Sequence, residues 1–358
     1  MSDEAAVQAH VTVAYGDSVH TCAAAVNAVN LGRIDPRRRR IAFGWALSAD
    51  ARAILSHGWE VREVREPLGG TPARKAVILD ARVHANKRAM LSRAMYWDTD
   101  HFPLLSGVRH IEQLWAVNPE ASMVASREPG SREPCFSGGL LLFQPSGKRH
   151  SEYERLIALG PLGAPHHCAH QIPGHDDQRY INEAFVPASA AAAQGWNQTD
   201  YQPLQFETWA VRTPWSFLGR TSGLGPRLDC QRTAESLERL ADSYHFYGRM
   251  PPWGGNCAEC VLRGLPCNVE LARRGRVKRP TCAYFAAQAL WWAAFARLPA
   301  RLRNLCYERL KNTSSIEAGG RAKRGNRGIG TGLLAGCNLT EASRLSDADE
   351  FDWSPWKR

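Results

Sequence analysis

Segments that favour β-strands alternate with helical segments in the N-terminal part of the chain. Strands are predicted at 11–15, 41–45 and 59–64, and helices at 20–31 and 49–57. Strands that alternate with helices at this spacing indicate an α/β fold with a mostly parallel, twisted sheet flanked by helices. The sequence contains neither a GxGxxG fingerprint after the first strand nor a GxxxxGK(S/T) loop, so neither of these nucleotide-binding loops is predicted.

The composition is that of a globular protein with ample material for a core. Of the 358 residues, 44% are apolar and 22% are charged, which excludes a disordered chain, a collagen and a disulfide-stapled miniprotein. Ten cysteines at irregular spacing favour reduced thiols over a disulfide framework. The N-terminus also lacks the pattern of a signal peptide. We therefore expect a cytoplasmic protein.

An excess of basic residues leaves several kinds of partner open. The chain has 45 Lys and Arg against 35 Asp and Glu, a net charge of +10, which suits phosphate-bearing ligands, acidic surfaces or nucleic acid. The run Arg37–Arg40 favours a charged, solvated turn, because no aromatic residues are interleaved with it. A basic nucleic-acid-binding protein is therefore a less favoured alternative.

The chain divides into three parts where its composition changes. Residues 1–255 form the α/β domain, 256–311 a cysteine-containing insertion with a basic helical extension, and 312–358 a flexible Gly-rich tail. The apolar stretch 282–298 is interrupted by a glutamine and an arginine, so no transmembrane segment is predicted. We expect a helix packed on the body of the protein, with a peripheral membrane contact through 282–311 as the alternative.

The cysteines that follow residue 255 raise the question of a zinc site. Cys257 and Cys260 form a CxxC pair, but Cys267 and Cys282 follow at uneven spacing and form no second pair. We therefore expect free thiols in this segment, with zinc binding as the alternative.

Two aspartates follow directly after an apolar run. Met95–Trp97 is predicted to end a strand, and Asp98 and Asp100 come immediately after it. Open α/β sheets bind their ligands at the carboxyl ends of the strands. Paired carboxylates suit Mg²⁺ or Mn²⁺, and such an ion can neutralise a diphosphate. The sequence therefore predicts a metal and diphosphate site at this edge.

Three later segments carry groups that would complete such a site. Ser137–Gly139 is predicted to form a glycine turn that opens a buried strand, where the backbone can approach a ligand closely. Asp177, Gln178 and Asn182 lie around a predicted helix start, where they either bind sugar hydroxyls or cap the helix. His245 follows a helix-like stretch and would complete the coordination of the metal with a neutral imidazole.

The order of these elements resembles glycosyltransferase family 8, the glycogenin-like retaining glycosyltransferases. The resemblance runs from Val11 to Trp253, about two thirds of the chain. It rests on four motifs, which are D-x-D, F-N-S/A-G, D-Q-x-x-x-N and H-F-x-G-x-x-K-P-W. The residues that it implies are the metal ligands Asp98, Asp100 and His245, the catalytic pair Asp177 and Gln178, and the donor-binding residues Arg82, Ser137, Gly138, Gly139, Asn182, Gly248 and Arg249.

The resemblance also implies a fold and an activity. It implies a nucleotide-diphospho-sugar transferase fold of the GT-A type and a metal-dependent, retaining glycosyltransferase. Such an enzyme transfers a hexosyl group from a UDP-sugar to a hydroxyl of a glycan, protein or small-molecule acceptor, with Mn²⁺ or Mg²⁺ on the leaving diphosphate. Tyr15 and Asp17 lie near the position where the family holds the nucleotide base. The sequence leaves open whether the protein forms a homodimer.

Two positions depart from the motifs of the family. Ser137 stands where the motif F-N-S/A-G has its asparagine. Pro251 stands where the motif H-F-x-G-x-x-K-P-W has its lysine, which in the family binds the diphosphate. Proline removes both a charge and a backbone hydrogen-bond donor, although Arg249 lies close enough in sequence to replace the lysine. A catalytically impaired protein that binds a nucleotide sugar or glycan is therefore the main alternative.

Overall fold

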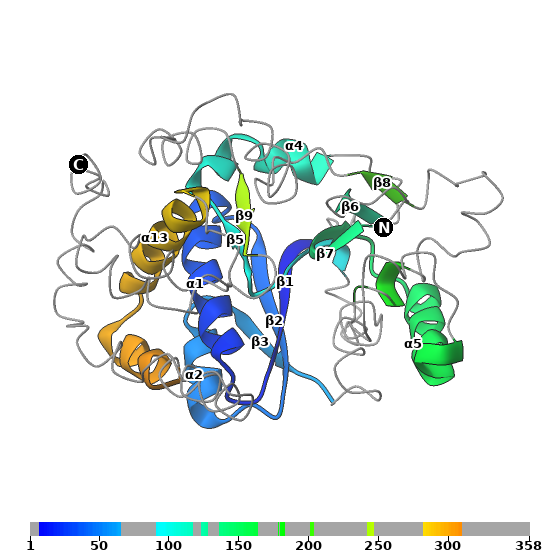
Figure 1. Ribbon diagram of the computed structural model, residues 1–358, viewed down its shortest axis with the longest axis horizontal. Coiled ribbons are helices and arrows are strands. Elements are labelled where there is room, and N and C mark those ends of the chain that lie inside the picture. Colours follow the sequence, from blue (N-terminus) through cyan, green and yellow to red (C-terminus); the bar gives the residue numbers. More distant parts are fainter. Residues whose placement is uncertain are drawn as a thin grey trace, which may run out of the picture.

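The computed structural model of the chain describes residues 7–65, 91–116, 123–127, 136–163, 178, 180–182, 201–203, 242–246 and 282–309 (Figure 1). Its elements are β1 (Val7–Tyr15), α1 (Val19–Ile34), β2 (Arg39–Trp45), α2 (Ala49–Ser56), β3 (Glu60–Glu63), β4 (Leu91–Trp97), β5 (His101–Pro103), the 3-10 helix η4 (Leu105–Arg109), α4 (Ile111–Ala116), β6 (Met123–Arg127), β7 (Phe136–Phe143), α5 (Gly147–Gly163), β8 (Tyr201–Pro203), β9 (Ser243–His245) and α13 (Cys282–Ala296). Residues 300–309 form a further helix. The cysteines at 257–267 and the predicted tail lie outside the described residues.

The main sheet has seven strands in the order β3-β2-β1-β4-β7-β6-β8. β1 pairs in parallel with β2 and β4, β2 pairs in parallel with β3, and β6 pairs in parallel with β8. β7 runs antiparallel to both of its neighbours, β4 and β6. The prediction of a mostly parallel sheet is therefore confirmed, with β7 as the strand that reverses direction. β5 and β9 form a separate antiparallel pair.

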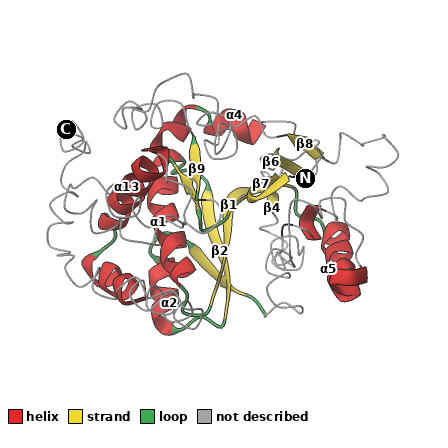
Figure 2. Cartoon of the chain, viewed as in Figure 1, coloured by secondary structure: helices red, strands yellow, loops and turns green. Residues whose placement is uncertain are grey.

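Helices cover both faces of the main sheet, because its strands carry apolar side chains on both faces. In β7, Leu140 and Leu142 belong to one core cluster, whereas Leu141 and Phe143 belong to the other. The first cluster includes buried residues of α1, α2 and α4, and the second includes residues of α5. Figure 2 shows α1 and α2 on one side of the strands and α5 on the other. β7 is thus buried on both faces, as is usual for strands of α/β folds.

The strands and helices predicted for the N-terminal part are confirmed. α1 continues past the predicted end at residue 31, because the N–H of Asp35 donates to the carbonyl oxygen of Leu31 (2.8 Å). α2 begins after Ser48, whose Oγ accepts a hydrogen bond from the N–H of Ala51 (3.1 Å). A serine in this position is a common helix N-cap.

The four arginines at 37–40 each bind an acceptor of the chain itself. Their partners are Glu112 for Arg37 and Arg38, Glu60 for Arg39, and the carbonyl oxygen of Gly58 for Arg40. Carboxylates of the fold therefore offset part of this charge, which weakens the argument for a nucleic-acid surface at this run.

A buried polar network lies behind the end of β4. Trp97 Nε1 donates to His10 Nδ1 (3.1 Å), and His10 Nε2 lies 3.0 Å from Asp35 Oδ2. An indole N–H can only donate, so the proton of His10 is on Nε2 and the ring is neutral. Burial lowers the pKa of His10, although the hydrogen bond to Asp35 acts in the opposite direction. Burial acts to raise the pKa of Asp35, but His10 and Arg38 together outweigh it and hold this pKa at about 2.

The C-terminal helices pack on the body of the protein. α13 lies against α1, and its side chains Trp291, Trp292 and Phe295 are buried. The predicted helix packed on the body is therefore confirmed for the described residues. No helix in the described ranges is long and apolar enough to cross a membrane.

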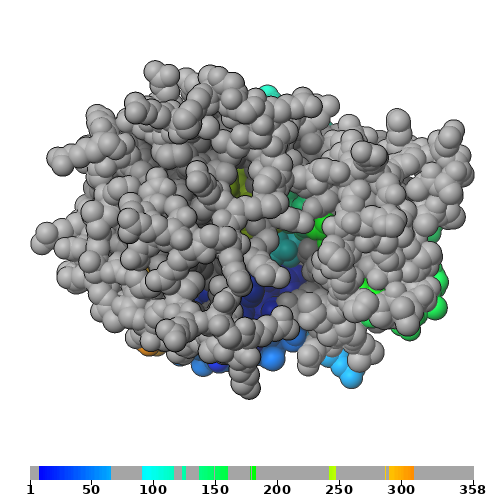
Figure 3. All heavy atoms as spheres, viewed as in Figure 1, coloured from blue at the N-terminus to red at the C-terminus, as the bar shows by residue number. Residues whose placement is uncertain are grey.

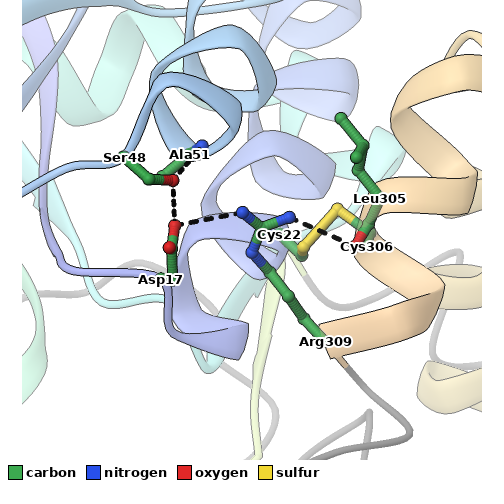
Figure 4. Close-up of a disulfide and its surroundings, with 7 residues drawn as sticks. All are labelled: Asp17, Cys22, Ser48, Ala51, Leu305, Cys306 and Arg309. Carbon is green, nitrogen blue, oxygen red and sulfur yellow. Dashed lines mark hydrogen bonds and ion pairs between the residues drawn. A yellow bond between two sulfur atoms is a disulfide. The ribbon is translucent and has the colours of Figure 1, made fainter.

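The prediction of reduced thiols is wrong for one pair of cysteines. Cys22 of α1 and Cys306 of the helix 300–309 form a disulfide, with Cα atoms 5.6 Å apart (Figure 4). The two residues are 284 positions apart, so no local spacing signals the pair. Arg309 Nη2 lies 3.0 Å from Asp17 Oδ1. The C-terminal helix is therefore joined to the first βα unit by a covalent link and an ion pair.

Candidate functional site

Asp98, Thr99 and Asp100 form a turn at the carboxyl end of β4, as predicted. The N–H of Asp98 donates to the carbonyl oxygen of Gly139 (2.8 Å), which extends the pairing of β4 with β7 by one residue. Asp98 Oδ1 accepts from the N–H of Thr99 (2.8 Å). The carbonyl oxygen of Asp98 accepts from the N–H of His101 (3.0 Å). β1 and β2 run parallel to β4, so their carboxyl ends reach the same edge of the sheet.

The short pair β5 and β9 brings His245 to this turn. His101 of β5 lies opposite His245 of β9, and their rings stack with centroids 4.9 Å apart. The N–H of Phe246 donates to the carbonyl oxygen of Asp100 (2.9 Å). As a result, His245 Nε2 lies 3.4 Å from Asp100 Oδ1. The structure therefore brings together two of the three predicted metal ligands. His245 ends a strand, and the helix-like stretch expected before it lies outside the described residues.

The glycine pair lies within β7, which corrects the prediction of a turn before the strand. β7 already begins at Phe136, which pairs with β6. The strand continues through the glycines, since the carbonyl oxygen of Gly139 accepts from the N–H of Asp98. At Gly139, a Cβ atom would lie 2.9 Å from His101 Nδ1 and 3.0 Å from His245 Nε2. Such an approach is too close for any side chain, so glycine is what allows the stacked rings to lie against β7.

His101 is a site residue that the sequence analysis missed, although it directly follows Asp100. Its side chain is buried, and its Nε2 lies 2.9 Å from Ser243 Oγ. Burial lowers the pKa of His101 well below its usual value, and the neighbouring His245 lowers it further. His101 therefore packs as a neutral ring beneath His245.

Three polar side chains of α1 bind this part of the chain, and the sequence analysis missed them too. His20 and Asn27 bind the Asp-x-Asp turn, whereas Asn30 binds the end of β5, beyond the turn. Their partners are Thr99 Oγ1 for His20 Nδ1 (2.8 Å), the carbonyl oxygens of Asp98 and His101 for Asn27 Nδ2 (both 3.2 Å), and the carbonyl oxygen of Pro103 for Asn30 Nδ2 (2.8 Å). One feature of the sequence does indicate such a role. Asn27 and Asn30 lie in a helix that otherwise consists mainly of small apolar residues. α1 thus contributes both to the core and to the site.

Gln178 and Asn182 lie in one helical segment next to β7. Gln178 Oε1 accepts from the N–H of Gly138 (2.9 Å), and Asn182 Nδ2 donates to the carbonyl oxygen of Gln178 (2.8 Å). The N–H of Gly139 donates to the buried Ser137 Oγ (3.4 Å). Gln178 is therefore connected through β7 to the turn that carries Asp98.

The carboxyl ends of β1 and β2 add an aromatic pair and a carboxylate to the edge. Tyr15 stacks on Trp45, with ring centroids 5.6 Å apart. Asp17 Oδ1 accepts from Ser48 Oγ and from Arg309 (Figure 4). The hydrogen bond from Ser48 is the main cause that lowers the pKa of Asp17, and Arg309 contributes in the same direction. Figure 3 shows described atoms from blue, teal, green and yellow-green parts of the chain meeting at the centre of one face.

The ligand atoms at the turn suit a divalent metal ion. Carboxylate oxygen and imidazole nitrogen are both ligands of Mn²⁺, and the buried Asp100 Oδ1 faces His245 Nε2. Within the described residues, however, no group of three His, Cys, Asp or Glu side chains lies close enough to hold a metal. Asp98 instead directs one oxygen to the N–H of Thr99. Asp100 and His245 thus offer two kinds of ligand that such an ion takes, with Asp98 on the same turn.

Some predicted site residues lie outside the described part of the chain. They are Arg82, Asp177, Gly248 and Arg249, together with the departure at Pro251. Their proposed contacts with the sugar donor stay predictions.

Comparisons with known proteins return glycosyltransferases among the solved structures. No protein-family model matches the chain, and no curated protein is similar to it in sequence. A galactosyltransferase LgtC in complex with donor and acceptor sugar analogues matches with 14% identity and a TM-score of 0.45, over 84% of this chain and 100% of that chain. The glycosyltransferase GlyE of Streptococcus pneumoniae matches with 13% identity and a TM-score of 0.44, over 86% of this chain and 64% of that chain.

A third solved structure matches over nearly the whole chain. The mannosyltransferase PcManGT of Pyrobaculum calidifontis, in complex with GDP-Man and Mn²⁺, has 13% identity and a TM-score of 0.33, over 97% of this chain and 89% of that chain. The three structures named here are glycosyltransferases. At these identities and TM-scores the likeness by itself assigns no activity to this chain.

Proposed function

We propose that the protein is a retaining glycosyltransferase that transfers a hexosyl group from a UDP-sugar to an acceptor hydroxyl. The observation that carries this proposal is the approach of His245 Nε2 to Asp100 Oδ1, 3.4 Å apart, at the carboxyl ends of parallel strands. This edge is where α/β sheets bind nucleotides. A carboxylate beside an imidazole provides there for a divalent ion and, through it, for a diphosphate leaving group.

Each residue of the site has a role in this reaction. Asp100 and His245 would hold the ion, with Asp98 beside them, and Mn²⁺ or Mg²⁺ when bound neutralises charge on the leaving diphosphate. Gln178 is fixed to the N–H of Gly138, so its helix lies at a set position relative to the turn. That position is consistent with a contact to the donor sugar. The residues that would hold the ion are fixed before the donor binds, and preorganised groups of this kind contribute most to stabilising a charged leaving group.

A protein that binds the nucleotide sugar without turnover is the second candidate. Asp98 Oδ1 accepts from the N–H of Thr99, so one predicted metal ligand is partly engaged by its own turn. Ser137 and Pro251 also stand where the resembling family has an asparagine and a lysine. These features together favour a protein whose donor affinity or turnover is reduced.

Calorimetry of UDP binding with and without Mn²⁺ tests the proposal. We expect the wild type to bind UDP in a Mn²⁺-dependent manner and Asp100→Asn to lose about tenfold or more of this affinity, because a neutral amide is a poor ligand for the ion. The control is Asp50→Asn, which changes an exposed carboxylate in the first turn of α2. This variant should bind UDP as the wild type does.

A panel of UDP-sugars then separates the candidates. Hydrolysis or transfer of one sugar supports the glycosyltransferase and names its donor, whereas binding without either reaction supports the second candidate. Absence of UDP binding under all conditions contradicts both. A nucleic-acid-binding protein would instead bind an oligonucleotide with an affinity that falls steeply with salt and does not respond to Asp100→Asn.

A further inference from the structure

We propose that Asn27 of α1 is a positioning residue that sets the geometry of the Asp-x-Asp turn for the metal and the diphosphate. The proposal rests on the function proposed above and extends it to a helix outside the motifs. Asn27 would touch neither the sugar nor the ion. It would act through the backbone of the residues that do.

The carboxamide of Asn27 bridges the two ends of the turn. Its Nδ2 donates to the carbonyl oxygens of Asp98 and His101, each at 3.2 Å. These carbonyls belong to the residues on either side of Thr99 and Asp100, and the N–H of His101 also donates to the carbonyl of Asp98. The bonds from Asn27 fix the peptide planes at the two ends of the turn, and the bond from the N–H of His101 to the carbonyl of Asp98 holds the plane that follows Asp100. Together they set the course of the backbone at Asp100, and with it the direction of its side chain.

The hydrogen bonds of Asn27 point to a role in geometry more than in stability. Asn27 is completely buried, yet within the described part of the chain its Oδ1 has no hydrogen-bond partner. A buried acceptor without a partner costs free energy and offsets much of the gain from the two bonds that Nδ2 makes. An apolar residue of similar volume would avoid that cost but would remove the donor to both carbonyls. What only the asparagine contributes is therefore the position of these two carbonyls.

The helix that carries Asn27 is itself firmly held. Trp59 Nε1 donates to the carbonyl oxygen of Ala24 (2.7 Å), and Cys22 is bonded to Cys306. A side chain on a helix with such supports can fix a neighbouring turn more exactly than one on a loop. His20 and Asn30 lie on the same helix and bind Thr99 and the carbonyl oxygen of Pro103, whereas Asn27 binds both ends of the turn.

Asn30 offers a matched control on the same helix. It is also buried, and its Nδ2 donates to the carbonyl oxygen of Pro103 (2.8 Å), beyond the turn. Asn30→Leu therefore removes a comparable buried hydrogen bond and leaves the ends of the turn at Asp98 and His101 untouched. A purely structural role would make Asn27→Leu and Asn30→Leu behave alike.

The experiment measures Mn²⁺ affinity in the presence of UDP, from the electron paramagnetic resonance signal of free Mn²⁺, together with the thermal midpoint. We expect Asn27→Leu to weaken Mn²⁺ binding about tenfold or more, the range found for residues that orient metal ligands. Asn27→Ser keeps one hydroxyl donor and should lie between Asn27→Leu and the wild type. Asn30→Leu should lower the thermal midpoint at least as much as Asn27→Leu does. Its Mn²⁺ affinity, however, should stay within about threefold of that of the wild type.

Each outcome decides the proposal. Equal loss of Mn²⁺ binding in Asn27→Leu and Asn30→Leu, or none in Asn27→Leu, overturns the positioning role while the proposed function stands. If Asn27→Leu does not fold, the intermediate affinity of Asn27→Ser decides, and wild-type affinity in that variant overturns the role. A wild type that binds no Mn²⁺ with UDP overturns the proposed function and this inference together.

Discussion

Gly139 is the residue whose replacement should disturb the site most directly. A Cβ atom there would lie 2.9 Å from His101 Nδ1 and 3.0 Å from His245 Nε2. Both rings are buried, so they have little room to yield, and the approach of His245 to Asp100 should be disturbed. We expect Gly139→Ala to destabilise the protein by about 1–3 kcal/mol. Mn²⁺-dependent UDP binding should fall by about tenfold or more, as measured by calorimetry and chemical denaturation.

Gly32 supplies the control for this substitution. A Cβ atom at Gly32 would meet the guanidinium of Arg40 at 3.6 Å, an ordinary contact, and Gly32 lies in α1 with no positive φ. Gly32→Ala should therefore stabilise the helix by about 0.5–1 kcal/mol and leave UDP binding unchanged. If Gly139→Ala binds UDP with wild-type affinity, the rings of His101 and His245 can adjust to the added methyl group, which would contradict the prediction.

At the scale of single residues, the sequence indicates the candidate ligands, but it does not indicate the residues that support them. Asp98 and Asp100 are recognisable because an apolar strand ends directly before them, and His245 because it lies in an aromatic motif. Asn27 and His101 are not recognisable in this way, because their roles depend on how α1 and β9 pack against the turn. The strict need for glycine at Gly139 likewise arises only from rings that are distant in sequence.

At the scale of elements, the buried network between β1, α1 and β4 predicts a pH dependence of stability. His10 is neutral in the fold and its pKa is lowered from 6.5 by burial. In the unfolded chain the histidine takes up a proton below about pH 6.5, so the unfolded state is favoured as the pH falls below that value. The free energy of unfolding should therefore decrease toward lower pH, by up to about 1.4 kcal/mol per pH unit for this group.

The variant His10→Gln tests this account through denaturation curves between pH 5 and pH 7.5. It should be less stable than the wild type at pH 7.5, since Trp97 and Asp35 lose their partner, but its stability should fall less steeply toward pH 5. Parallel pH profiles for the two proteins would contradict a neutral His10 in the fold. Asp35 adds a second decline at lower pH, because its pKa of about 2 lies below the usual 3.8 and its stabilisation is lost as the pH falls through that interval.

The elements themselves follow from the sequence where the pattern is periodic and local. The strands and helices between residues 7 and 65 are predicted correctly apart from their ends. The extent of β7 is predicted wrongly, because two glycines favour a turn when they are considered alone. Pairing with β6 and with the Asp-x-Asp turn extends the strand through these glycines, and a partner strand cannot be recognised from the glycines themselves.

At the scale of the whole molecule, the general architecture is predictable and the long-range links are not. Alternating strands and helices indicate an α/β sheet, but the reversed direction of β7 depends on which strands become neighbours. The disulfide between Cys22 and Cys306 joins segments 284 positions apart. Cys22 lies on α1, the helix that also supports the candidate site, so the disulfide makes the C-terminal helix part of the same folded body. Figure 1 shows α13 beside α1.

Reduction of this disulfide should therefore destabilise the whole domain. Closing so long a loop limits the unfolded chain, and native disulfides of this kind stabilise by about 2–5 kcal/mol. The half-exposed ion pair of Arg309 with Asp17 should contribute less than about 1 kcal/mol, so Arg309→Gln should shift the thermal midpoint far less than a reductant does. The double variant Cys22→Ala/Cys306→Ala should unfold near the reduced wild type and not respond to the reductant. Equal midpoints for oxidised and reduced wild type, or a free Cys22 thiol in peptide maps of protein purified without reductant, would contradict the link.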